Sequence, residues 1–300
     1  MFGLNKIIPV EPSYNFLNYR KFFLIISSFA ISISILLLFF KGLNLGIDFK
    51  GGTLIEVKTI NSSIGELRNI LSPNFNEVSL QEFGSKNTII IRLQNENNQE
   101  SIETVNKVKS LISDQVEEFR RSEFVGPTIS SELLFSGFQA VSFALFAILI
   151  YIWLRFEWQF GFGAVVALTH DVLFTLGVLS VLNVEFSLAT IAAILTIAGY
   201  SINDTVVIFD RVRENLRKYK RLELVELFNL SINNTLSRTI MTSLTTLLAL
   251  FSLYIFGGEV IKPFALTMII GVLIGTYSSV FIAVPTLLIF KFRPQDEDND

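Results

Sequence analysis

The chain has 300 residues, of which 51% are hydrophobic and 29 are phenylalanine, and its mean hydropathy is positive. Few soluble domains of this length have such a composition, which indicates a membrane protein. The formal net charge is −3, and no basic patch alternates with aromatic residues, so nucleic acid is not expected as a partner. The absence of cysteine excludes disulfides, thiolate metal sites and cysteine nucleophiles.

Six apolar segments are long enough to cross a lipid bilayer as helices. One precedes a long polar segment, 41–132, and five follow it, so the sequence predicts an α-helical membrane protein with a 1+5 arrangement of spans and one large extramembrane domain. The first span has no cleavage pattern after it and is predicted to be an uncleaved anchor. The predicted spans are 22–40, 133–154, 160–182, 186–209, 236–256 and 263–290.

Lysine and arginine gather on one side of these spans. They occur in the N-terminal segment 1–21, in the loop 210–235 and after the sixth span, whereas the opposite short loops hold few. The positive-inside rule therefore places both termini in the cytoplasm and exports 41–132. The acidic tail, 291–300, is predicted to be disordered.

The exported segment alternates between strand and helix signals. Strands are predicted over 52–57, 77–83, 88–93 and 123–129, and helices over 63–72 and 98–120. The order βαββαβ predicts an α+β, ferredoxin-like domain. In the loop 210–235, the pattern of residues 210–230 predicts a charged amphipathic helix, either on the membrane surface or in a solvated helical hairpin.

Asp204 is an acidic residue within an apolar segment and is the main functional candidate. It lies in the fourth span, about a turn and a half from the basic end, and ionisable groups at such positions are costly and usually functional. Arg238 opens the fifth span at a similar depth, so the two side chains are expected to meet. Burial favours the neutral acid and the arginine favours the carboxylate, which gives the pair two states and a possible role as a proton relay. A permanent ion pair that stiffens the bundle is the alternative.

Other polar residues of the spans are predicted to form a network near this pair. In the third span, His170 could relay protons or only bond neighbouring helices, and Asp171 is the adjacent acid. Adjacent helical residues point about 100° apart, so at most one of these two should face Asp204. The remaining candidates are Tyr200, Ser201, Asn203, Thr239 and Thr242.

The sixth span carries small residues at four-residue steps, Gly271, Gly275 and Ser279, which predict close helix packing. Pro285 should bend the end of that span. No nucleophile set, phosphate-binding loop or metal-ligand spacing occurs, so neither an enzyme nor a cofactor or metal is predicted.

Several blocks together resemble one family, the SecF subunits of the bacterial protein translocase. Gly46–Gly52 reads GIDFKGG, and His170–Val172 reads HDV in the third span. Gly199–Asn215 reads GYSINDTVVIFDRVREN, Ser237–Thr239 reads SRT, and Gly275–Ser279 reads GTYSS. The resemblance covers nearly the whole chain. The exported segment is much shorter than that of SecD, which favours SecF.

The resemblance implies a role and partners that spacing does not show. SecF forms a twelve-helix unit of the resistance-nodulation-division type with SecD in the bacterial inner membrane. It works with SecYEG and often YajC, and uses the proton motive force to promote release of unfolded preproteins into the periplasm. The family's proton-transport residues correspond to Asp204 and Arg238 here. Sodium coupling, a passive scaffold and half of a small-molecule exporter are the alternatives.

Overall fold

The computed structural model describes residues 12–60, 62–75, 78–82, 87–93, 101–258 and 260–290. The predicted acidic tail, 291–300, and the first eleven residues lie outside these ranges. The chain divides into two compact units. We call them the membrane unit, which comprises 1–43, 141–184 and 189–300, and the sheet unit, which comprises 44–140 and 185–188.

Six helical segments are long and apolar enough to cross a membrane, as predicted. They extend further at several ends than the hydropathy indicated, because polar turns continue the helices beyond the apolar stretches. The helices are α1 (Arg20–Phe40), α5 (Pro127–Arg155), α6 (Trp158–Leu182), α7 (Leu188–Lys218), α8 (Leu224–Phe256) and α9 (Lys262–Ser278), the last continued by a π-helical turn, η5 (Ser279–Ala283), and by α10 (Val284–Ile289); a 3-10 turn, η2 (Phe16–Tyr19), precedes α1.

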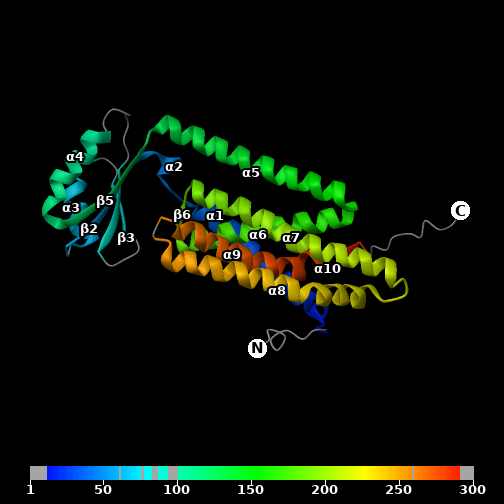
Figure 1. Cartoon of the computed structure of the whole chain (residues 1–300). Coiled ribbons are helices and arrows are strands. Elements are labelled where there is room, and N and C mark those ends of the chain that lie inside the picture. The colour runs from blue at the N-terminus through cyan, green and yellow to red at the C-terminus, as the bar shows by residue number, and fades with distance from the viewer. Residues whose placement is uncertain are drawn as a thin grey trace. The chain divides into compact units, whose positions relative to one another are not determined.

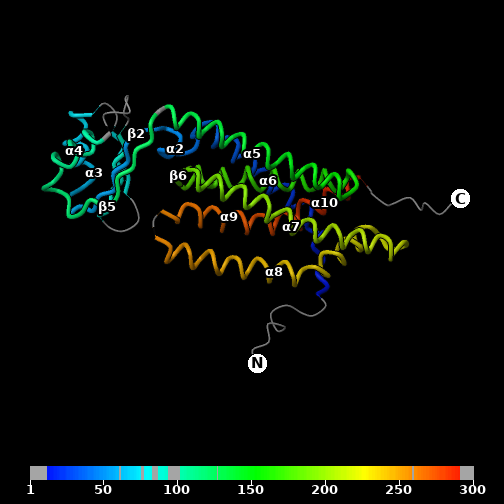
Figure 2. Tube along the Cα trace, turned by 45° about the horizontal axis from the view of Figure 1, so that its top comes forward, coloured from blue at the N-terminus to red at the C-terminus, as the bar shows by residue number. Residues whose placement is uncertain are grey.

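Within the membrane unit, α6 packs against α1 and α9, and α8 runs beside α9 (Figures 1 and 2). Near Pro285, where the sequence predicts a bend, the helix contains the π-helical turn η5, which ends immediately before the turn that holds this proline. Proline cannot donate a backbone hydrogen bond and its ring crowds the preceding turn, so the wider π turn accommodates it.

The segment between the fourth and fifth spans is helical, as predicted, but a short turn divides it. The helix α7 continues to Lys218 and α8 begins at Leu224, so the segment forms a helical hairpin rather than a single helix along the membrane surface. The leucines of this segment that suggested a membrane-surface stripe are part of the bundle core, where Leu216 and Leu227 are buried.

The sheet unit contains four antiparallel strands in the order β3-β4-β2-β5. Figure 1 shows α3 and α4 on one side of this sheet. The core between them consists of alternate strand residues such as Ile55 and Ile91, packed on Leu67 and Ile112. The elements are β1 (Asn44–Leu45), α2 (Ile47–Lys50), β2 (Gly52–Thr59), α3 (Ile64–Leu71), β3 (Val78–Glu82), β4 (Thr88–Leu93), α4 (Ser101–Ile112), a 3-10 turn η4 (Ser113–Gln115), β5 (Val116–Val125) and β6 (Glu185–Phe186), which pairs with β1.

The predicted helix over 98–120 was wrong beyond Ile112, and the last strand begins at Val116 rather than at 123. Val116 and Phe119 fit a helical stripe, but they are needed in β5, which pairs with β2 along its whole length. Two register shifts in that pairing disturb the simple alternation of the strand pattern, which hid the strand in the sequence.

Candidate functional site: a buried polar network

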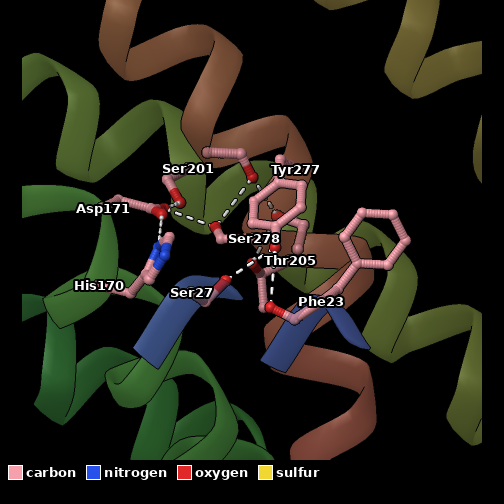
Figure 3. Close-up of polar contacts among 10 residues, drawn as sticks. Phe23, Ser27, His170, Asp171, Ser201, Thr205, Tyr277 and Ser278 are labelled. Carbon is pink, nitrogen blue, oxygen red and sulfur yellow. Dashed lines mark hydrogen bonds and ion pairs between the residues drawn. The ribbon is translucent and has the colours of Figure 1, made fainter. Parts of the chain in front are cut away.

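Asp171 is the centre of a hydrogen-bond network that joins three helices. Its side chain on α6 is 0% exposed. One carboxylate oxygen, Oδ2, accepts hydrogen bonds from Ser201 Oγ on α7 at 2.5 Å and from Ser278 Oγ on α9 at 2.7 Å. The other, Oδ1, lies 3.0 Å from His170 Nδ1 (Figure 3). Asp171 is therefore a fully engaged acceptor where α6, α7 and α9 meet.

His170 faces a different neighbourhood from Asp171, although Nδ1 reaches back to the acid. Its ring stacks near Phe174 and Tyr277, with centroids about 6 Å away. It also lines a mainly apolar cavity of about 440 Å³ between α1, α6 and η5. Tyr277 Oη contacts Ser27 Oγ of α1 at 2.7 Å, so polar contacts continue from this region to the first span (Figure 3).

Asp204 lies one turn beyond Ser201 on α7 and is only 3% exposed. In contrast to Asp171, its Oδ2 is buried without any hydrogen-bond partner. A buried polar atom in this state is uncommon in proteins and requires an explanation. Nearby, Thr205 Oγ1 lies 2.9 Å from Ser279 Oγ, which fastens the same turn of α7 to η5.

Arg238 lies on α8 and is exposed. Among the described side chains it forms no ion pair with Asp204 within 4.0 Å, although the two opposite charges still attract each other. Direct pairing of the two residues stays a prediction. Thr239, the next residue, is buried and its hydroxyl has no hydrogen-bond partner.

The remaining predicted network residues contact α8, lie on it, or are exposed. Tyr200 Oη donates a long hydrogen bond, 3.5 Å, to Ser243 Oγ of α8, whereas Asn203 is exposed. Thr242 bonds only to carbonyls of its own helix, at Arg238 and Thr239. Three of the predicted network residues, His170, Asp171 and Ser201, are thus directly connected.

Small residues lie where α7 and α9 approach closely. A Cβ atom at Gly275 would lie 3.0 Å from the Cβ of Ser201, and one at Gly271 would lie 2.2 Å from Ile197. Ser279 bonds Thr205 rather than serving only as a small residue. The close approach at Gly275 is what brings Ser201 and Ser278 to the same carboxylate.

Several polar residues of the network had not been identified from the sequence. Ser278 stands beside the small-residue steps, which suggested packing and concealed its role as a donor. Their common signal was a hydroxyl within an apolar span, but such hydroxyls also bond to their own helix. The residues are Ser27, Thr205, Thr276, Tyr277 and Ser278.

The arrangement defines a class of protein before any comparison. Six spans surround buried acids and hydroxyls that belong to several helices, and no three His, Asp or Glu side chains within the described ranges come together to hold a metal ion. Ionisable groups on the inside of a helix bundle mark ion or proton pathways in membrane proteins. The chain is a multi-pass membrane protein with such a buried polar centre.

Comparison with known proteins gives the family. Residues 104–293 match the C-terminal family of SecD/SecF protein export membrane proteins, and residues 36–59 match the SecD/SecF GG motif. Protein translocase subunit SecF from Rickettsia rickettsii is 42% identical over 96% of this chain and 95% of its own length. The corresponding subunit from Rickettsia bellii is 43% identical over 95% of this chain and 96% of its own length. The chain belongs to the SecF family of protein translocase subunits, as its sequence motifs predicted.

Two solved structures support the same family assignment. The crystal structure of SecDF, a translocon-associated membrane protein from Thermus thermophilus, superposes with a TM-score of 0.86 at 36% identity. A second SecDF structure, in a super-membrane-facing form, gives a TM-score of 0.69 at 35% identity. Each match covers 94% of this chain and 39% of the SecDF chain. The chain thus spans well under half of SecDF, which supports SecD as the partner that supplies the rest.

Proposed function

We propose that this chain, together with SecD, uses the proton motive force to promote the export of preproteins through SecYEG, with Asp204 as the titrating group. The observation that carries the proposal is the buried Oδ2 of Asp204, which has no hydrogen-bond partner. A buried carboxylate oxygen without a hydrogen-bond donor is stabilised by protonation or by an approaching cation. The carboxyl group can therefore change between its charged and neutral forms without the loss of a hydrogen bond at this oxygen.

The contrast with Asp171 supports this assignment. Asp171 is held by Ser201, Ser278 and His170, so a change in its protonation would disrupt contacts among three helices. Asp204 lies on the same helix as Ser201, and a movement of α7 in response to Asp204 would act directly on the Asp171 contacts. Arg238 is the cation proposed to respond, approaching Asp204 when the acid is charged and withdrawing when it is neutral.

The proposal also covers the location and the orientation of the chain. The chain lies in the bacterial inner membrane with both termini in the cytoplasm, and the sheet unit is a periplasmic, ferredoxin-like domain. The order of its strands and helices and its all-antiparallel sheet support that domain type. YajC is a further possible component, and unfolded preprotein is the client on the periplasmic side.

The test is Asp204→Asn in vesicles that contain SecD and SecYEG, with export measured with and without a proton gradient. Because Oδ2 makes no hydrogen bond, the amide should leave assembly with SecD unchanged. Export should fall to the level that wild type shows in the presence of a protonophore.

Asp210→Asn is the matched control on the same helix. Asp210 is 43% exposed and pairs with Arg155 at 2.8 Å, and exposed pairs of this kind contribute little to stability. This variant should retain gradient-dependent export.

Export at the wild-type level by Asp204→Asn would disprove the proton role, and loss of SecD from the purified complex would favour a scaffold. A sodium gradient that replaces the proton gradient would identify the other coupling ion.

A further inference from the structure

The sheet unit contains a cavity of about 500 Å³ at one margin of its sheet, which we call the edge cavity. Three parts of the chain surround it: the segment from β1 to α2, the end of α3, and the adjoining ends of β3 and β4. A volume of this size suits one or two side chains rather than a folded partner. The lining residues are Asn44, Leu45, Gly46, Ile47, Lys50, Gly51, Arg68, Ser72, Val78, Ser79, Arg92 and Leu93.

The edge cavity is basic. Lys50, Arg68 and Arg92 line it, and no Asp or Glu among the described residues does. Arg92 is the innermost cation, with a side chain 13% exposed. Its Nη2 pairs with Glu185 at 2.7 Å, but its buried Nε has no hydrogen-bond partner. Of the charges on the described residues, two positive ones remain after Arg92 is paired with Glu185, so this lining favours an anionic group.

The same place has an unpaired strand edge. β3 pairs with β4 on one side, and no other described strand pairs with its outer side. Val78 and Ser79 belong both to this edge and to the cavity. An exposed edge offers alternating N–H and C=O groups to an extended chain, and a pocket beside it can select one of that chain's side chains.

We infer that the edge cavity and the outer edge of β3 together bind an extended polypeptide segment that carries an acidic side chain. The backbone of the segment adds a strand beside Val78 and Ser79. Its carboxylate enters the cavity, where the Arg68 guanidinium can donate hydrogen bonds and Lys50 and Arg92 add positive charge. The inference rests on the proposed function in one respect, because the exported client supplies such unfolded segments.

The test uses the full-length chain in detergent and two fluorescent ten-residue peptides, measured by fluorescence anisotropy. One peptide carries two glutamates among serine and threonine, and the other has glutamine in their place. The acidic peptide should bind at least tenfold more tightly. Lys50→Gln combined with Arg68→Gln should remove this difference, whereas Lys109→Gln on α4, outside the cavity, should preserve it. Arg92 is left unchanged because it pairs with Glu185.

A third peptide tests strand addition. N-methylation of alternate backbone amides in the acidic peptide should weaken binding about tenfold, since it blocks pairing with β3. Equal binding of the acidic and glutamine peptides would overturn the inference. So would full competition by millimolar inorganic phosphate combined with no effect of N-methylation, because the cavity would then be a simple anion site. Asp204→Asn should bind the acidic peptide like wild type, which keeps failure of this inference distinct from failure of the proton role.

Discussion

At the scale of single residues, the membrane unit holds two buried acids in opposite states. Asp171 has a partner for each of its oxygens, and Asp204 has one oxygen with none. Burying a polar group is inexpensive only when its hydrogen bonds are made. Asp171 is therefore explained by structure alone, whereas Asp204 requires a function to account for its cost.

Substitutions at Asp171 should separate its hydrogen bonds from its charge. In Asp171→Asn, the amide oxygen can still accept from Ser201 and Ser278, and the amide nitrogen can donate to His170 Nδ1, so thermal stability should remain near that of wild type. Asp171→Leu removes all three of these hydrogen bonds and should lower stability by roughly 2 kcal/mol, given about 0.6 kcal/mol or more for each intramembrane hydrogen bond. Thermal unfolding in detergent, followed by the fluorescence of Trp153 and Trp158, measures both. An Asn variant as unstable as the Leu variant would show that the charge itself is required.

The sequence identified the acids more readily than their partners. An acid in an apolar segment is conspicuous, and helical spacing placed Ser201 on the face of Asp204. Which hydroxyl reaches which acid depends on the rotation and spacing of neighbouring helices, which no single segment encodes. The donor role of Ser278 is of this kind.

At the scale of elements, close helix approach depends on particular glycines. A Cβ atom at Gly177 of α6 would lie 2.2 Å from Ser34 Oγ and 2.9 Å from its Cα, a backbone atom that cannot turn aside. A Cβ atom at Gly199 of α7 would meet nothing within 4 Å. The same Gly→Ala change should therefore have opposite consequences at the two positions.

Gly177→Ala should push α1 away from α6 and lower the unfolding temperature in detergent. Gly199→Ala is the matched control and should be neutral or slightly stabilising, since alanine favours a helix over glycine by about 1 kcal/mol. Removal of the Ser34 side chain should relieve this clash, so adding Ser34→Gly to Gly177→Ala should partly restore the unfolding temperature. A Gly177→Ala variant as stable as the control would mean that α1 and α6 do not approach this closely.

Hydropathy found all six spans because each is a long apolar stretch, but it failed where helix and strand patterns overlap. Val116 and Phe119 satisfy a helical stripe, and only the demand of β2 for a full-length partner assigns them to β5. Likewise the amphipathic pattern of 210–230 does not mark the turn between Lys218 and Leu224. The error at β5 arises because long-range pairing overrides local pattern.

At the scale of the whole molecule, the spans differ greatly in how much of their surface this chain covers. Of the most apolar stretch of each span, 67% is buried in α9–α10 but only 6% in α5, 11% in α1 and 17% in α8. The poorly covered spans must face lipid or another chain. That pattern fits a subunit that makes up 39% of the matched SecDF chain.

The orientation of the chain can be measured directly because the wild type contains no cysteine, so each single-cysteine variant carries one thiol. Asn69 on α3 and Glu223 before α8 are exposed positions, and neither contributes to the basic cluster that sets orientation. With Asn69→Cys, a membrane-impermeant maleimide should label cells whose outer membrane alone has been opened. With Glu223→Cys, labelling should require disruption of the inner membrane, because the positive-inside rule predicts that the arginines and lysines around 211–221 keep that turn in the cytoplasm. The reverse pattern would invert every span and place the sheet unit in the cytoplasm, where it could not meet an exported polypeptide.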